Sequence, residues 1–193
     1  MKVTLIRHGR PAADLTTRIT GHEFAAWLAA YDQAGLDPAP PPPDALAHCL
    51  TDCRLLLTSP TRRARESAHQ LASELASQLG LKLGPEVSPD AVEVPLPASI
   101  SWPFPARPTT LVVIARILWV LRVAHAKESA TLARLRAQRL ARHLNACSAE
   151  ADHVALVGHG YMHIFTRRAL ENLGWKRVRA QGHGYWSCSQ FER

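Results

Sequence analysis

Three short apolar runs, each suited to a buried β-strand, are separated by segments that carry helical periodicity. These runs cover residues 2–6, 54–58 and 153–157. Strands that alternate with helices indicate an α/β fold with a mainly parallel central sheet covered on both faces. Because 193 residues support one sizeable core, we expect residues 1–193 to form a single domain with a three-layer α/β/α architecture.

Apolar spacing and turn signals predict the remaining elements. Helices are expected over residues 21–35, 44–50, 61–79, 109–125, 127–147 and 161–173. Further strands are expected over residues 81–87, 177–180 and 185–191. The last two strands are so close in sequence that we expect them to form an antiparallel edge of the sheet. Glu128-Ser129 is expected to cap the helix that follows it.

Two Pro-rich segments, residues 38–44 and 92–108, are predicted to be exposed connections. The second is long, and structureless loops of that length are more often functional than idle. The apolar segment 111–124 is interrupted by Arg116 and Arg122 and is too short to cross a bilayer. We therefore interpret it as a buried helix and expect no membrane partner.

The composition is typical of a globular protein with a basic surface, with 47% hydrophobic residues and a net charge of +7. The basic residues are scattered over several elements, which argues against a nucleic-acid partner. A basic pocket for an anionic small molecule explains part of the excess. The four cysteines show neither a CxxC pair nor zinc-like spacing, so reduced thiols in a cytoplasmic protein are expected. Lys2 leads directly into a strand, so no signal peptide is expected.

Each of the three apolar runs is followed directly by arginine, histidine or glycine. Arg7-His8-Gly9 follows the first run, Ser59-Pro60-Thr61-Arg62-Arg63 the second, and Gly158-His159-Gly160 the third. In open α/β sheets, ligands bind beyond the carboxyl ends of the strands. If the three strands are parallel neighbours, His8, Arg63 and His159 therefore lie at one place.

Two histidines and two arginines at one site suit phosphoryl chemistry. Arginine presents a planar set of donors that fits phosphate oxygens. A histidine ring nitrogen can attack phosphorus or donate a hydrogen bond to a phosphate oxygen. Phosphoryl transfer needs mainly positioning and compensation of charge. The spacing therefore predicts a phosphate site built from Arg7, His8, Arg63 and His159.

The segments LIRHG, SPTRRARESA and LVGHG resemble the histidine phosphatase superfamily, which is also called phosphoglycerate-mutase-like. Each motif alone is weak, but their order, strand context and spacing extend the resemblance over nearly the whole chain. The resemblance implies that His8 is the nucleophile and takes up the phosphoryl group. It also implies that Arg7, Arg63 and His159 bind that group. Arg63 fits the motif better than Arg62, because Ser67-Ala68 then follows at the spacing of the family's RAxxTA.

The resemblance further implies an acidic residue that protonates the leaving oxygen and then activates water. Glu93 is the preferred candidate, because it opens the long Pro-rich loop, which could close over the site. Glu86 and Asp90 are close rivals. No cofactor and no metal are implied; His159 and His163 stand four residues apart, but no third ligand is apparent.

The motifs favour a phosphatase that hydrolyses a phosphorylated small molecule. Phosphoglycerate mutases usually continue RHG with Thr or Ser and then Trp-Asn, whereas this chain continues with RPAADL and is shorter. A mutase is the nearest alternative. A non-catalytic phospholigand-binding regulatory domain and a phosphohistidine-protein phosphatase are further alternatives. Loops 11–21 and 94–108 are expected to set specificity, and the sequence fixes neither the substrate nor the oligomeric state.

Further side chains have two interpretations each. Arg10 either adds a cation for the substrate or is a solvated turn residue. Trp102 and Phe104 either form a lid over the substrate or anchor the Pro-rich loop. His183 and Trp186 either line the pocket or, as is commoner for edge aromatics, contribute to packing.

Overall fold

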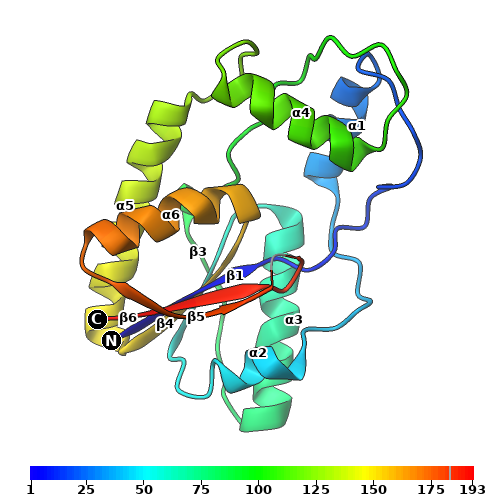
Figure 1. Ribbon diagram of the computed structural model, residues 1–193. Helices are drawn as coiled ribbons and strands as arrows, with labels where there is room; N and C mark the ends of the chain where they lie inside the picture. The colour runs from blue at the N-terminus through cyan, green and yellow to red at the C-terminus, as the bar shows by residue number, and fades with distance from the viewer. Residues whose placement is uncertain (183) are drawn as a thin grey trace.

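The computed structural model describes residues 1–182 and 184–193, and this part of the chain forms a three-layer α/β/α fold (Figure 1). Its strands lie in one sheet in the order β3-β2-β4-β1-β6-β5. Their bounds are β1 Lys2–Arg7, β2 Leu55–Thr58, β3 Glu86–Val87, β4 His153–Gly158, β5 Lys176–Gln181 and β6 Cys188–Glu192. β3, β2, β4 and β1 are parallel, whereas β6 is antiparallel to β1 and to β5. The predicted mainly parallel sheet with an antiparallel edge is confirmed.

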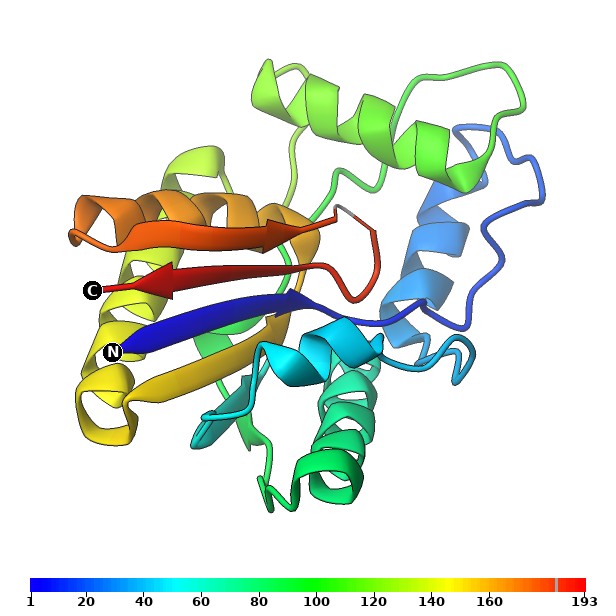
Figure 2. The same cartoon turned by 60° about the horizontal axis from the view of Figure 1, so that its bottom comes forward.

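Helices cover both faces of this sheet. They are α1 Phe24–Gln33, α2 Asp44–His48, α3 Arg62–Leu79, α4 Pro108–Val120, α5 Ala130–Ala151 and α6 Gly160–Asn172, with a short 3₁₀ helix η1 at Pro89–Ala91. Figures 1 and 2 show α5 and α6 on one face of the sheet and α2 and α3 on the other. The strand termini that carry the three motifs all lie at the carboxyl edge, because β2, β4 and β1 are parallel neighbours.

Alternating side chains of the central strands build two apolar cores. Leu5 of β1 packs in the core that contains Leu140 of α5. The next residue, Ile6, lies in the opposite core together with Leu71 of α3. Successive strand residues point to opposite faces, so a strand that is covered on both sides is apolar at consecutive positions. This is why the strand runs are continuously apolar in the sequence.

A third apolar cluster lies beyond the carboxyl end of β1, where α1 and α4 pack against each other (Figure 2). We call this unit, residues 19–33 and 96–120, the cap. Phe24 of α1 and Leu111 of α4 are completely buried in it. Among the described residues, the buried side chains of this cluster belong to neither core beside the sheet, but Trp119 near the end of α4 packs in the core that contains Leu140. The cap thus has an apolar cluster of its own and is joined to the sheet through Trp119, at the edge that carries the polar residues.

The helix predicted over residues 109–125 ends earlier than expected, at Val120. Arg122 adopts a left-handed conformation with φ of 62°, and the backbone N–H of Val123 donates to the carbonyl of Leu118 at 2.9 Å. A residue in this conformation turns the chain away from the helix axis. The periodicity of the sequence continued past this turn and so overestimated the length of the helix.

The prediction that segment 111–124 is buried is wrong for one side of α4. Val113 is 57% exposed and Ile117 is 52% exposed, although Leu111 and Ala115 are buried in the cap. The helix is apolar all round, and the cap core covers only one of its sides. Within the described part of the chain, every helix is too short or too polar to traverse a bilayer.

Two other predicted bounds are corrected. α5 begins at Ala130 instead of residue 127, because Ser129 is the N-cap and its hydroxyl accepts a bond from the N–H of Leu132 at 3.3 Å. Glu128 does not cap the helix but forms an ion pair of 2.6 Å with Arg136. The strand predicted over residues 81–87 is limited to Glu86 and Val87.

The stripe of α3 that faces the sheet should contribute strongly to stability. Leu75 is completely buried, whereas Leu79, one turn later on the same helix, is 38% exposed. We expect Leu75→Ala to lower the free energy of unfolding by about 2–5 kcal/mol and Leu79→Ala to lower it by less than about 1 kcal/mol. Urea unfolding followed by circular dichroism measures both, and equal losses would contradict the described packing of α3.

Candidate active site

The register between β1 and β4 brings two histidines together. Arg7 is paired with Gly158 across the two parallel strands, and the N–H of His8 donates to the Gly158 carbonyl at 2.9 Å. His8 and His159 therefore leave the sheet side by side, with ring centroids 5.0 Å apart in an edge-to-face arrangement. His8 is 3% exposed and His159 is fully buried. The first and third motifs form one site.

The second motif contributes Arg63 from the first turn of α3. Arg63 is buried, its guanidinium lies 4.7 Å above the ring centre of Tyr31, and Nη1 donates to the Tyr31 carbonyl at 3.2 Å. Arg62 points elsewhere and forms an exposed ion pair of 2.7 Å with Glu66. Successive helical residues face different directions. The structure therefore directs only Arg63 toward the histidines.

A neighbouring carbonyl assigns the tautomer of His8, and two hydroxyls are compatible with the complementary tautomer of His159. Nδ1 of His8 lies 2.7 Å from the Gly9 carbonyl, and since a carbonyl only accepts, Nδ1 carries the proton and Nε2 has the lone pair. Nε2 of His159 lies 2.9 Å from the Ser59 hydroxyl and 3.0 Å from that of Thr61. Both hydroxyls donate to this nitrogen when Nδ1 of His159 carries the proton. In these tautomers, Nε2 of His8 offers a lone pair to a ligand, and Nδ1 of His159 offers an N–H.

Two buried donors at the site lack a protein partner. Among the residues that the structure describes, neither Nε of Arg63 nor Nδ1 of His159 makes a hydrogen bond. Buried N–H groups in folded proteins are nearly always bonded, so these two donors suit the oxygens of an anionic ligand. Arg7 lies beside them, with its guanidinium 4.7 Å from the ring centre of Tyr185. Tyr185 in turn lies 5.8 Å from the ring of His8.

Two glycines of the motifs are required by close packing. A Cβ on Gly9 would lie 2.5 Å from Leu36 Cδ1 and 2.7 Å from the Trp186 ring. A Cβ on Gly158 would lie 2.7 Å from Nε2 of His163. Contacts this short do not occur between real side chains, so any larger residue would displace the turn that carries His8 or His159.

Burial beside positive charge keeps both histidines uncharged. Burial, followed by the charge of Arg63, lowers the pKa of His8 to about 3, although the bond to Gly9 acts in the opposite direction. The pKa of His159 is held well below its usual range by burial and then by His8 and Arg63. A neutral imidazole has the lone pair that a nucleophile needs. The site is thus a neutral histidine pair among guanidiniums.

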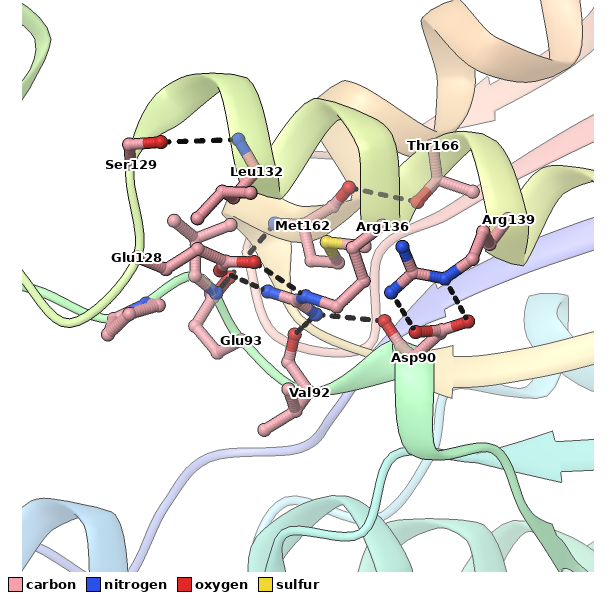
Figure 3. A network of polar contacts seen from close by, with 12 residues as sticks. Asp90, Val92, Glu93, Glu128, Ser129, Leu132, Arg136, Arg139, Met162 and Thr166 are labelled. Carbon is pink, nitrogen blue, oxygen red and sulfur yellow. Dashed lines mark hydrogen bonds and ion pairs between the residues drawn. The ribbon is translucent and has the colours of Figure 1, made fainter.

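The side chain of Glu93 lies against the first turn of α6, the helix that directly follows His159 in the chain (Figure 3). Its carboxylate accepts from the N–H of Met162 at 2.9 Å and from that of Tyr161 at 3.4 Å. The N–H groups of the first turn of a helix have no partner within the helix, so a carboxyl oxygen suits them as an acceptor. Glu93 also belongs to the charges that act on the phenol of Tyr31, together with Arg63 and Arg7. It therefore lies at the same end of the sheet as the histidines.

The rival acidic residues are placed differently. Asp90 accepts two bonds from Arg139 of α5, the shorter at 2.9 Å (Figure 3). Glu86 is exposed on β3 at the edge of the sheet. Arg136 of α5 donates to the backbone carbonyls of Asp90 and Val92 at 2.8 Å and 2.6 Å. This guanidinium fixes the segment that leads to Glu93.

No protein-family model matches the chain, and its sequence matches no curated protein. Solved structures match it over nearly its full length. Mycobacterial hydrolase 1 is 20% identical, the match covers 98% of this chain and 89% of that one, and the TM-score is 0.64. A mycobacterial glucosyl-3-phosphoglycerate phosphatase in complex with VO3 is 20% identical, with coverage of 98% and 91% and a TM-score of 0.60.

A third match is a mutant phosphoserine phosphatase from Entamoeba histolytica in complex with phosphoserine, at 15% identity, 99% and 90% coverage and a TM-score of 0.57. The chain has the histidine phosphatase fold. The resemblance that the three motifs indicate is thus confirmed for the fold. In the histidine phosphatase fold of this chain, the motifs occupy the adjacent ends of β1, β2 and β4.

Ser67, Tyr31 and Tyr185 were given no role at the site from the sequence, although Ser67 belongs to the second motif. Ser67 accepts from the N–H of Gly9 at 3.0 Å and donates to the carbonyl of Arg63 at 2.7 Å, so it links two motifs. Burial raises the pKa of Tyr31 to about 12, against the charge of Arg63. Tyr31 has the helical spacing of the apolar residues in the helix predicted over residues 21–35, and Tyr185 is the first residue of the strand predicted over residues 185–191. Neither position therefore carried a signal of its own. The serine in place of threonine at Ser67 was the one available signal.

The structure also places most of the side chains for which the sequence left two interpretations open. Arg10 is half exposed and pairs with Asp37 at 3.8 Å, as a turn residue would. Trp186 is buried and packs against the turn of His8, and its indole N–H donates to the Pro40 carbonyl at 3.3 Å. His183 lies outside the described residues. Phe104 is 68% exposed, so it does not close over the site.

The site also adjoins an open cleft of about 520 Å³ between the end of α1 and the start of α3. Thr61, whose hydroxyl contacts His159, is part of its wall. Asp32, Arg65 and His69 give the cleft a polar lining. Among the described residues, no group of three or more His, Cys, Asp or Glu is arranged to hold a metal ion.

The buried histidines should resist protonation. We expect the His8 and His159 resonances to remain those of neutral imidazoles between about pH 8 and pH 5, while the histidines of the urea-denatured chain titrate near about 6.5. NMR of histidine-labelled protein, assigned with His8→Ala and His159→Ala, measures this. Because the unfolded chain then binds more protons than the folded one below pH 6.5, stability falls as the pH decreases. Titration of His8 with an ordinary pKa in the folded protein would contradict its described surroundings.

Proposed function

We propose that the chain is a phosphatase that hydrolyses a phosphomonoester of a small molecule through a phosphohistidine on His8. The observation that carries the proposal is the buried pair of His8 and His159 beside Arg63, with donors that lack protein partners. A phosphoryl group bound there would accept bonds from Arg63, Arg7 and His159. Guanidinium and imidazole N–H groups suit its oxygens and compensate its charge.

In the first step, Nε2 of His8 attacks phosphorus, and the bond from phosphorus to the leaving oxygen breaks. The proton on Nδ1 of His8, held by the Gly9 carbonyl, orients the ring and leaves Nε2 free to act. Glu93 donates a proton to the leaving oxygen, so an alcohol departs. The product is a phosphoryl group bonded to Nε2 and still held by the arginines.

In the second step, water attacks the phosphorus of the phosphohistidine. Glu93, now a carboxylate, takes a proton from this water, and the bond from nitrogen to phosphorus breaks. Inorganic phosphate leaves, and His8 and Glu93 return to their starting states. The charges in this cycle are compensated by side chains, so the proposed mechanism includes no metal and no cofactor.

The cleft beside Thr61 supports a polar leaving group. It adjoins the hydroxyl that contacts His159 and is lined by both acidic and basic side chains. A panel of phosphorylated metabolites identifies the substrate. Release of inorganic phosphate indicates the phosphatase, whereas formation of a phosphorylated isomer without phosphate release indicates a mutase.

His8→Ala should abolish turnover and leave the fold intact. We expect kcat to fall by about 10³-fold or more, because the nucleophile is removed. The wild-type protein should accumulate an acid-labile, alkali-stable phosphoenzyme during turnover, and the variant should not. His143→Ala, which changes an exposed histidine of α5, is the matched control and should behave as the wild type.

Retention of most activity in folded His8→Ala would refute the mechanism. If the wild-type protein forms no phosphoenzyme with any substrate of the panel but binds phosphorylated ligands, it is a non-catalytic binding domain instead.

Glu93→Gln should slow proton transfer in a way that depends on the leaving group. With an alkyl phosphate, whose leaving oxygen needs a proton, we expect the first step to slow by about 10²–10⁴-fold. With p-nitrophenyl phosphate, whose leaving group is stable as an anion, a rapid burst of nitrophenol should remain, followed by slow hydrolysis. Stopped-flow measurements separate the two steps.

Asp90→Asn and Glu86→Gln are the matched controls, because both remove a rival carboxylate nearby in the sequence. Both should retain normal turnover with either substrate. If one of them shows the leaving-group dependence and Glu93→Gln does not, the acid–base role belongs to that residue.

A further inference from the structure

The outer side of α4 and the turn after it expose a row of large apolar side chains. Val113, Ile117 and Val120 follow each other at the spacing of one helix face and are 57%, 52% and 54% exposed. Leu121 and Val123 continue the row and are 64% and 69% exposed. We call these five residues the cap face. Single exposed apolar residues are ordinary, but a contiguous group of them marks an interaction surface.

The charged residues in the segment that carries the cap face are all basic. No aspartate or glutamate occurs between residues 94 and 127. Arg107, Arg122 and Lys127 are exposed at the two ends of α4 and in the turn beyond it. Arg116 does not belong to this group, because its guanidinium turns inward and donates to the Val94 carbonyl at 2.8 Å. The cap face is therefore an apolar row with basic residues at both ends. The nearest carboxylate in the sequence, Glu128, pairs with Arg136 of α5, and the charge of Lys127 acts on Asp32 of α1.

This charge pattern disfavours a second copy of the chain as the partner. Self-association through a two-fold axis places the same surface on both sides. Two antiparallel α4 helices would then bring Arg107 of one copy toward Arg122 of the other, without a carboxylate from this segment to offset the repulsion. Like charges across an interface cost free energy. The complement of the cap face is a surface that is both apolar and anionic.

We propose that the cap face binds the surface of an anionic lipid bilayer. α4 lies parallel to the bilayer, with Val113, Ile117 and Val120 at the boundary of headgroups and acyl chains. Arg107 and Arg122 contact lipid phosphates, and such basic residues each add to the attraction of an anionic leaflet. Figure 2 shows α4 at the periphery of the molecule, on the far side of the cap from the sheet, where it can meet a flat surface.

This inference departs from the sequence prediction of no membrane partner. That prediction depended on segment 111–124 being too short to cross a bilayer and interrupted by Arg116 and Arg122, which argues against a spanning helix and not against a peripheral contact. The exposure of Val113 and Ile117 makes a peripheral contact available. The contact is peripheral, because α4 packs on the cap through Leu111 and Ala115 and stays part of the folded protein. It is also independent of the proposed catalysis, since none of these residues belongs to the candidate active site.

Sedimentation with vesicles tests the proposal. The probes are vesicles of phosphatidylcholine alone and vesicles in which about one third of the lipid is phosphatidylglycerol. We expect the wild-type protein to partition onto the anionic vesicles at about 0.05 M NaCl, and this binding to weaken by about tenfold or more at about 0.5 M NaCl. Phosphatidylcholine alone should bind at least about tenfold less.

Two pairs of variants separate the apolar and the basic contributions. Ile117→Glu/Val120→Glu should lower the partition coefficient by about tenfold or more, whereas Val178→Glu, which changes an exposed valine of β5, should not. Arg107→Glu/Arg122→Glu should lower it similarly. Lys82→Glu/Lys176→Glu makes the same change in net charge at exposed positions elsewhere and is its control. Circular dichroism and thermal unfolding verify that each variant is folded.

Three results would overturn the proposal. The first is absence of binding to anionic vesicles by folded wild-type protein. The second is binding that both control variants lose as strongly as the cap-face variants, because it would then depend only on net charge. The third is a concentration-dependent dimer in light scattering that Ile117→Glu/Val120→Glu abolishes, because the cap face would then be covered by a second copy.

Discussion

The backbone hydrogen bond from His8 to the Gly158 carbonyl fixes the geometry on which the whole site depends. It continues the parallel register of β1 and β4 by one residue past the sheet, so both motif histidines emerge at the same level. A register shift of one residue would move every side chain of β1 to the opposite face. Both faces are buried against helices, so such a shift would also disrupt two cores. The packing of Leu5 and Ile6 therefore disfavours a register shift that would separate His8 from His159.

Burial determines the chemical state of the residues that the sheet brings together. His8, His159 and Arg63 are almost inaccessible to water, and guanidinium groups resist deprotonation much more strongly than imidazoles. Positive charge therefore stays on arginine, and the imidazoles remain neutral. The ring of Tyr31 lies against the guanidinium of Arg63, and the ring of Tyr185 lies against that of Arg7. The face of an aromatic ring attracts a cation. Hydroxyls from Ser59 and Thr61 hold the second imidazole in place.

Most of the sheet and the position of the motifs could be predicted from the sequence, because strands covered on both sides have continuous apolar runs that are easy to recognise. The placement of Arg63 followed from the spacing of one motif. Other features depended on long-range packing that no local pattern encodes. The contact of Tyr31 with Arg63 joins α1 to α3, and the exposure of Val113 depends on which side of α4 the cap covers. Ser129, and not Glu128, caps α5 because Arg136 holds the carboxylate of Glu128.

The separate apolar core of the cap divides the molecule into two regions with different tolerance of change. The strand ends hold the candidate phosphoryl site, and Gly9 and Gly158 there leave no space for larger residues. Of the cap's buried side chains that the structure describes, Trp119 packs in a core beside the sheet, whereas Phe24 and Leu111 pack in an apolar cluster of the cap. Substitutions there can reshape the surroundings of the leaving group while the turns of His8 and His159 stay unchanged. Divergent evolution can therefore vary the apolar cluster of the cap more freely than the turns of His8 and His159, where Gly9 and Gly158 admit no larger residue.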